Sequence, residues 1–202
     1  MFHDTLVPCA ERRNINMQSI VNDVFYSIYQ YLGFGIVFAV ICIFALPEIE
    51  KKGIKKIIIY SWYMLKKEKM YRCRFIFFMV LFMILSRTLI CRNIWQCPWE
   101  NIIGEWGIVT PEGRFNTEGL LNILLFFPVV YFGLLGFNQS YRSNKEIIIK
   151  VIKMSFYFSC IIEICQLFFR LGTFQLSDIF QNTFGGFIGS IVYILHRKYL
   201  KI

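Results

Sequence analysis

The chain has 202 residues, and 56% of them are hydrophobic, which is too large an apolar fraction for a soluble domain of this length. The net charge is +9, but the aromatic side chains fall inside apolar runs, where they cannot stack on bases. The composition therefore excludes a nucleic-acid partner and relates the basic charge to membrane topology and anionic lipid headgroups.

Five apolar blocks of membrane-spanning length follow one another along the chain. They cover about residues 24–46, 75–91, 119–137, 147–169 and 179–195. As α-helices, blocks of this length reach roughly 25–35 Å. Because the first 22 residues lack the apolar core of a signal peptide, we expect the first block to stay as an uncleaved anchor. The sequence thus predicts an all-α, polytopic transmembrane helical bundle with about five spans.

Basic residues gather in three segments that lie on the same side of the membrane if the chain crosses it five times. These segments are 51–74, which holds nine Lys and Arg residues, 142–153, and 197–201. The connections on the other side hold most of the acidic residues. By the positive-inside rule we expect the basic side to be cytoplasmic, with the N-terminus outside and the C-terminus inside.

The segment 54–70 is both basic and amphipathic, with Trp62 and Tyr63 between lysines. One interpretation is a helix lying in the inner-leaflet interface. The other is a solvated basic loop that only sets the topology. The sequence leaves both open.

Polar side chains interrupt the later blocks or their ends, although the sequence spreads them over a long stretch. They are Arg87, Asn122, Glu163, Gln166, Arg170, Asp178 and Asn182. With five alternating spans, all of them fall at the level of the outer leaflet. The topology therefore predicts that they converge on one polar cluster.

The spacing of these residues places them on common helix faces. Glu163, Gln166 and Arg170 follow i, i+3, i+7, and Asp178 and Asn182 continue into a stripe of glycines. The glycines are Gly185, Gly186 and Gly189, and small residues at this spacing let a neighbouring helix approach closely. We expect the last helix to pack through them.

Inserting an ionisable group into the membrane costs a free energy of roughly 2.5–3.5 kcal/mol, so we expect a structural or functional role to offset this cost. One interpretation is an ion-pair lock that only holds the bundle together. The other is a polar pocket open to the outer leaflet, which we favour because two acids, two arginines and three amides exceed what cohesion needs.

No residue pattern indicates a catalytic centre, a cofactor or a metal site. No Cys or His spacing is typical of metal binding, and Ser177 has no histidine to activate it, so we predict it as a helix N-cap. Cys91 and Cys97 could form a disulfide if their loop faces an oxidising compartment; the sequence leaves this open.

The stretch "EICQLFFRLGTFQLSDIFQNTFGGFIG" resembles the signature of VanZ-like membrane proteins, and "NTEGLLNILLFFP" and Arg87 resemble two further segments of that family. The family often has a second acid where this chain has Gln175, which argues against a two-carboxylate site. The resemblance divides the chain into an extracytoplasmic segment (1–23), an additional helix with a basic loop (24–74) and a VanZ-like four-helix domain (75–202). It implies a multi-pass protein of the bacterial cytoplasmic membrane linked to tolerance of lipoglycopeptides such as teicoplanin.

Two functions follow as hypotheses. The first is a binding module whose polar cluster holds the head of an amphiphile, such as a lipid-anchored cell-wall precursor or a lipid-tailed antibiotic, among membrane lipids. The second is an intramembrane enzyme that modifies a cell-envelope lipid with Glu163 and Asp178 as acid and base. A small transporter is disfavoured because the sequence has no inverted repeat.

Overall fold

The computed structural model describes residues 17–45, 54–90, 99, 101–106, 117–137, 141 and 143–200. Over these residues the chain forms helices and no strand, which confirms the all-α prediction. The elements are α1 (Met17–Ala45), α2 (Ile54–Lys67), α3 (Lys69–Leu85), the π-helix η1 (Ser86–Ile90), α4 (Thr117–Gly136), α5 (Asn144–Phe169) and α6 (Leu176–Leu200).

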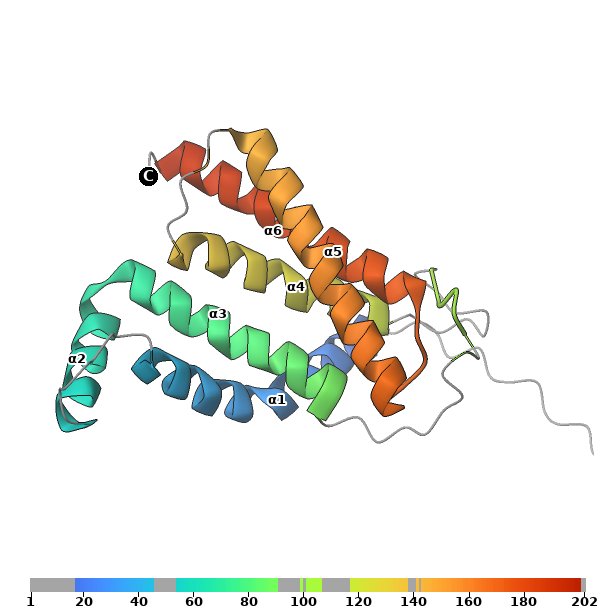
Figure 1. Cartoon of the computed structure of the whole chain (residues 1–202), viewed down its shortest axis with the longest axis horizontal. Helices are drawn as coiled ribbons and strands as arrows, with labels where there is room; N and C mark the ends of the chain where they lie inside the picture. Colours follow the sequence, from blue (N-terminus) through green and yellow to red (C-terminus); the bar gives the residue numbers. More distant parts are fainter. Residues whose placement is uncertain are drawn as a thin grey trace, which may run out of the picture.

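The five long helices alternate in direction (Figure 1). α1 packs along α3, α3 along α4 and α4 along α6, while α5 crosses over α4 and α6 and packs on α6. One end of the bundle, here called the basic end, carries α2, the start of α5 and the end of α6. The opposite end, here called the site end, carries η1, the start of α4, the end of α5 and the start of α6.

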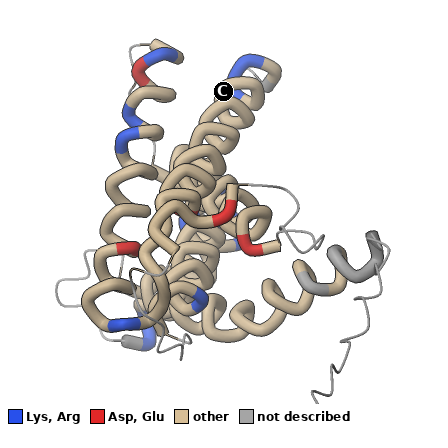
Figure 2. The backbone as a smooth tube through the Cα atoms, turned by 90° about the vertical axis from the view of Figure 1, so that its right-hand side faces the viewer, with Lys and Arg blue, Asp and Glu red and all other residues tan. Residues whose placement is uncertain are grey.

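Side chains tie the helix ends together at the basic end, where helices far apart in the sequence meet. The hydrogen bonds run from Tyr71 Oη to Ile43 O (3.0 Å), from Arg74 Nε to Gly136 O (2.7 Å) and from Arg197 Nη2 to Asn144 Oδ1 (2.8 Å). Lys and Arg residues accordingly lie at the start of α5 and beside the C-terminus in the end-on view (Figure 2). The basic segments that the sequence separates therefore share one end of the bundle.

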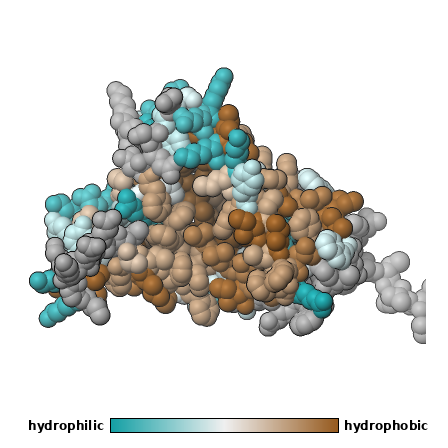
Figure 3. Space-filling view, in the orientation of Figure 1, coloured by the Kyte–Doolittle hydropathy of each residue, from teal (hydrophilic) through white to brown (hydrophobic). Residues whose placement is uncertain are grey.

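Three of the described helices are long and apolar enough to cross a membrane: Val24–Ala45, Lys69–Ile90 and Thr117–Gly136. α5 and α6 are not among them, although their 26 and 25 residues would reach about 35–40 Å. The side of the bundle seen in Figure 3 is largely apolar in the middle, with hydrophilic groups gathered at the left and at the top of the view. The total of five spans and the orientation of the termini stay predictions.

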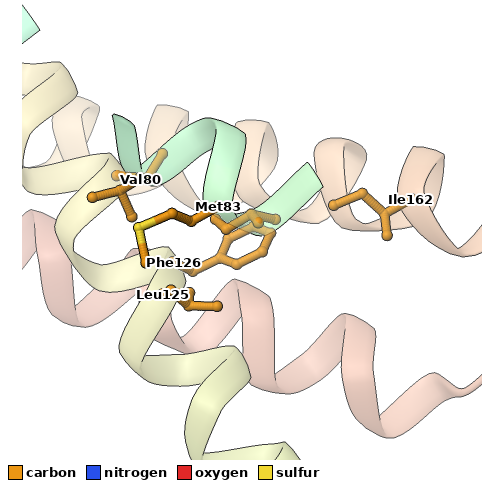
Figure 4. Packing of buried hydrophobic residues seen from close by; sticks show 7 residues of the cluster. Val80, Met83, Leu125, Phe126 and Ile162 are labelled. Atoms are coloured by element: carbon orange, nitrogen blue, oxygen red, sulfur yellow. The ribbon is translucent and has the colours of Figure 1, made fainter. Parts of the chain in front are cut away.

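The apolar core lies where α3, α4 and α5 meet. Val80 and Met83 of α3 pack against Leu125 and Phe126 of α4, and Ile162 contributes from α5 (Figure 4). Ile162 is only 1% exposed. It lies one residue before Glu163, so this core positions the buried polar face of α5.

Glycines let α6 approach its neighbours closely. A Cβ at Gly185 would lie 2.6 Å from Ile123 O, and one at Gly189 would lie 2.6 Å from Phe127 O, so both positions face the α4 backbone. A Cβ at Gly186 would meet the Ser155 side chain of α5. The glycine face of α6 is therefore wedged between α4 and α5, where no larger residue fits without movement.

α5 ends at the last residue of the predicted block, but Arg170, the residue after it, differs from the prediction. The helix begins at an N-cap, since Ser143 Oγ accepts a hydrogen bond from Glu146 N at 3.2 Å, and ends at Phe169. Arg170 takes a left-handed conformation with φ 54°, and Leu171 N donates to Gln166 O at 2.9 Å, as in a Schellman-type end. The prediction that Arg170 continues the helical stripe is wrong because the helix has already ended, and its side chain is exposed.

Candidate functional site

A chain of hydrogen bonds links three helices at the site end. Arg87 Nη1 of η1 donates to Asn122 Oδ1 of α4 at 3.3 Å, and Asn122 Nδ2 donates to Gln181 Oε1 of α6 at 3.3 Å. Gln181 Nε2 in turn donates to Glu105 O at 3.2 Å. Arg87 and Asn122, which lie 35 positions apart, are thus in direct contact.

Gln166 joins α5 to the π-helix. Its Nε2 donates to Thr88 O at 3.0 Å, and Thr88 Oγ1 donates to Ile84 O at 2.8 Å. The Gln166 side chain is 1% exposed, yet its Oε1 accepts no hydrogen bond from any described residue. Ser86, at the start of η1, has a buried hydroxyl in the same condition. Buried acceptors of this kind cost free energy unless something else satisfies them, and π-helices are frequent at functional sites.

Glu163 holds the connection between α5 and α6. The side chain is 1% exposed, and its Oε2 accepts a hydrogen bond from Gln175 N at 2.9 Å. Gln175 Nε2 donates to Thr173 Oγ1 at 2.8 Å, so the connection is also tied within itself. Glu163 therefore has a structural partner, and its carboxylate anchors the backbone just before α6.

Asn182 and Asp178 lie at different depths on α6. Asn182 is buried, and its Nδ2 donates to Ser159 Oγ of α5 at 2.8 Å, one turn before Glu163. Asp178 lies in the first turn of α6, where a negative charge is favourable at the positive end of the helix dipole. Asn182 thus belongs to the α5–α6 contact, whereas Asp178 is half-buried one turn earlier on α6.

Residues 101–106 cover the start of α6. Leu176 N donates to Ile102 O at 2.9 Å, and the ring of Trp106 packs on Phe180 with centroids 5.3 Å apart. Gly104 has φ +74°, and a Cβ there would overlap Ser177 Oγ, so only glycine fits. The prediction of Ser177 as an N-cap is wrong: α6 already begins at Leu176, and Ser177 lies within its first turn.

The cluster also includes residues outside the predicted set. Gln181 bridges α4 to residue 105, and Ser159 is the partner of Asn182. The sequence could have identified both residues. Gln181 is an amide inside an apolar block, and Ser159 lies four residues before Glu163 on the same helix face. No sequence pattern indicated the π-helix that carries Arg87.

Among the described residues, no group of three or more His, Cys, Asp or Glu side chains could hold a metal ion. Over the same residues the free cysteines are Cys42, Cys73, Cys160 and Cys165. Cys91 and Cys97 lie outside the described residues, as do residues 1–16 of the predicted N-terminal segment. What the site offers chemically is one guanidinium, two carboxylates and a set of amides.

The chain is similar to known proteins over nearly its whole length. The family model described as VanZ/LLP1 matches residues 4–197, which includes the first helix and the basic segment that the motifs had left outside the resemblance. "Protein VanZ" from Enterococcus faecium is 32% identical over 95 residues, a stretch that covers 46% of this chain and 53% of that relative. The chain thus matches about half the length of this relative, and no solved structure shows a significant similarity. The chain belongs to the VanZ/LLP1 family.

Proposed function

We propose that this chain is a multi-pass protein of the bacterial cell membrane that binds the polar head of an amphiphile at the site end. The ligand class is a lipid-anchored cell-wall precursor or a lipid-tailed antibiotic of the teicoplanin type. Its acyl chain would lie against the apolar helices, while Arg87 meets an anionic group and the amides and carboxylates bind sugar or peptide groups. The relative named VanZ supports this choice only through the family.

The observation that carries the proposal is the buried Oε1 of Gln166, which accepts no hydrogen bond from a described residue although Nε2 of the same side chain donates to Thr88 O of η1. Folded proteins leave few buried acceptors unsatisfied, so a buried acceptor beside the polar residues of the site end is a candidate contact for a ligand. A donor group on a ligand, such as a sugar hydroxyl or a peptide amide, would complete Gln166 without disturbing its bond to Thr88.

The proposal requires the site end to face the outside. We expect reporter fusions after Lys67, at the break between α2 and α3, and at the C-terminus to be cytoplasmic, and a fusion at the N-terminus to be extracytoplasmic, because the basic segments share one end. Paired topology reporters that are active on opposite sides provide the measurement. If the Lys67 and C-terminal fusions read on opposite sides, the orientation used here is wrong.

Ligand binding is tested with Gln166→Leu. The full chain, reconstituted in lipid nanodiscs, is titrated with teicoplanin and, separately, with a lipid-anchored cell-wall precursor, and binding is followed by calorimetry. The variant is expected to bind about tenfold more weakly than the parent because it loses one or two hydrogen bonds to the ligand. The melting temperature of each sample is recorded alongside.

Tyr71→Phe is the matched control, because it removes buried hydrogen bonds to Ile43 O and Ser61 Oγ at the basic end. It should lower stability by about 1 kcal/mol and leave the affinity unchanged. Absence of binding by the parent chain, or an equal loss of affinity in both variants, would contradict the proposal. Chemical conversion of the precursor during the titration would favour the intramembrane enzyme instead.

A further inference from the structure

α2 lies across the basic end, crosswise to α1 and α3 (Figure 1). One of its faces packs on those helices: Ser61 is fully buried, and its hydroxyl is hydrogen-bonded to Tyr71 Oη at 3.2 Å. Arg72 Nη1 donates to Lys66 O at 3.0 Å, which ties the end of α2 to α3. If α1 and α3 cross the membrane, α2 is therefore held parallel to the membrane plane.

The outward side of α2 carries two parallel rows of residues, and each row begins and ends with lysine. At positions i, i+4, i+7 and i+11, the rows are Lys55, Ile59, Trp62, Lys66 and Lys56, Tyr60, Tyr63, Lys67. The apolar and aromatic members are well exposed, with Ile59 at 60% and Trp62 at 61%. This surface, here called the lysine–aromatic face, is thus basic at both ends and apolar in the middle.

Within each row the second lysine lies over an aromatic ring. Lys66 Nζ is 5.0 Å from the centroid of Trp62, and Lys67 Nζ is 5.4 Å from that of Tyr63. Lys67 Nζ also donates to Tyr63 Oη at 2.9 Å. The charges and the rings are therefore presented side by side, in reach of a single bound group.

A bilayer surface with anionic phospholipids matches both properties of this face. Lysines bind headgroup phosphates, while Trp and Tyr prefer the level of the headgroups and Ile59 reaches the acyl boundary. No acidic residue occurs within 54–67, so nothing on the helix opposes negative charge. An acidic protein surface would pair with the lysines but would leave the apolar middle facing polar groups.

We propose that α2 is an in-plane helix that binds anionic phospholipids, such as phosphatidylglycerol, through the lysine–aromatic face on the basic side of the membrane. This interaction is independent of ligand binding at the site end, because the two surfaces lie at opposite ends of the bundle. It selects between the two interpretations of segment 54–70 in favour of the interfacial helix.

The test uses the full chain in nanodiscs that contain phosphatidylglycerol or phosphatidylcholine brominated on the acyl chains, which quench nearby tryptophans. The contribution of Trp62 is the difference between the parent and Trp62→Phe. We expect Trp62 to be quenched and, in lipid mixtures, to be quenched preferentially by phosphatidylglycerol. The triple variant K55Q/K56Q/K66Q should lower this preference by up to about fivefold per lysine.

The matched control is K145Q/K153Q/K198Q, which removes the same number of exposed lysines from α5 and α6. It should keep the preference measured at Trp62. Failure of brominated lipid to quench Trp62 would show that the face meets water or a protein. An equal loss in both triple variants, or no preference in the parent, would overturn the proposal as well.

Discussion

Leucine at Gly189 or at Gly185 is expected to reduce the amount of folded protein in the membrane strongly. At both positions even a Cβ would lie 2.6 Å from an α4 carbonyl oxygen, so the clash is with backbone rather than with a flexible side chain. Relief requires α6 to move away from α4. We expect a loss of about 3 kcal/mol, which is a large part of the stability of a typical domain.

The matched control is Gly33→Leu on α1, since a Cβ at Gly33 meets nothing within 4 Å. It has the same chemistry and lies in an apolar helix. Membrane abundance and melting temperature in detergent are the measurements, and Gly33→Leu should behave as the parent chain. Normal abundance of Gly185→Leu and Gly189→Leu would mean that α6 does not pack on α4 through this face.

At Glu163, two substitutions are expected to separate the structural role of the carboxylate from its role in binding. Glu163→Leu leaves the half-buried Gln175 N without its acceptor and should cost about 3 kcal/mol. Glu163→Gln keeps an oxygen for the same hydrogen bond and should cost about 1 kcal/mol. Both are read from melting temperature and membrane abundance.

Lipoglycopeptide susceptibility of cells that express each variant completes the test. If Glu163 serves a ligand, Glu163→Gln should remain folded and lose its protective effect, whereas Glu163→Leu should lose both. A Glu163→Gln variant that loses stability and phenotype together would support the lock and contradict the binding proposal. One that keeps both would show that the charge has neither role.

Much of the fold was predictable because hydropathy acts locally. A run such as 24–46 must become a helix in an apolar environment, since only helices and closed barrels satisfy every backbone group there. The glycine spacing on α6 likewise follows from helix periodicity, so Gly185 and Gly189 could be assigned to one face without a structure. The family resemblance also came from local motifs, and the match to residues 4–197 confirms it.

The conformation of Arg170 and the contact partners were decided by tertiary structure. Arg170 fits the helical period, but α5 ends before it, because a left-handed residue allows Leu171 N to reach Gln166 O and turn the chain toward α6. Gln175 stands where the family often has an acid, and the structure shows that its backbone N–H donates a hydrogen bond to Glu163.

The candidate site shows the same division. The sequence by itself determined that Arg87, Asn122, Glu163 and Gln166 carry polar groups into apolar helices, because that depends on composition and spacing alone. Which of them touch was decided only by the packing of α3 to α6, because a hydrogen bond across 35 or 78 positions depends on where the helices cross. Periodicity describes one helix at a time and contains no information on that crossing.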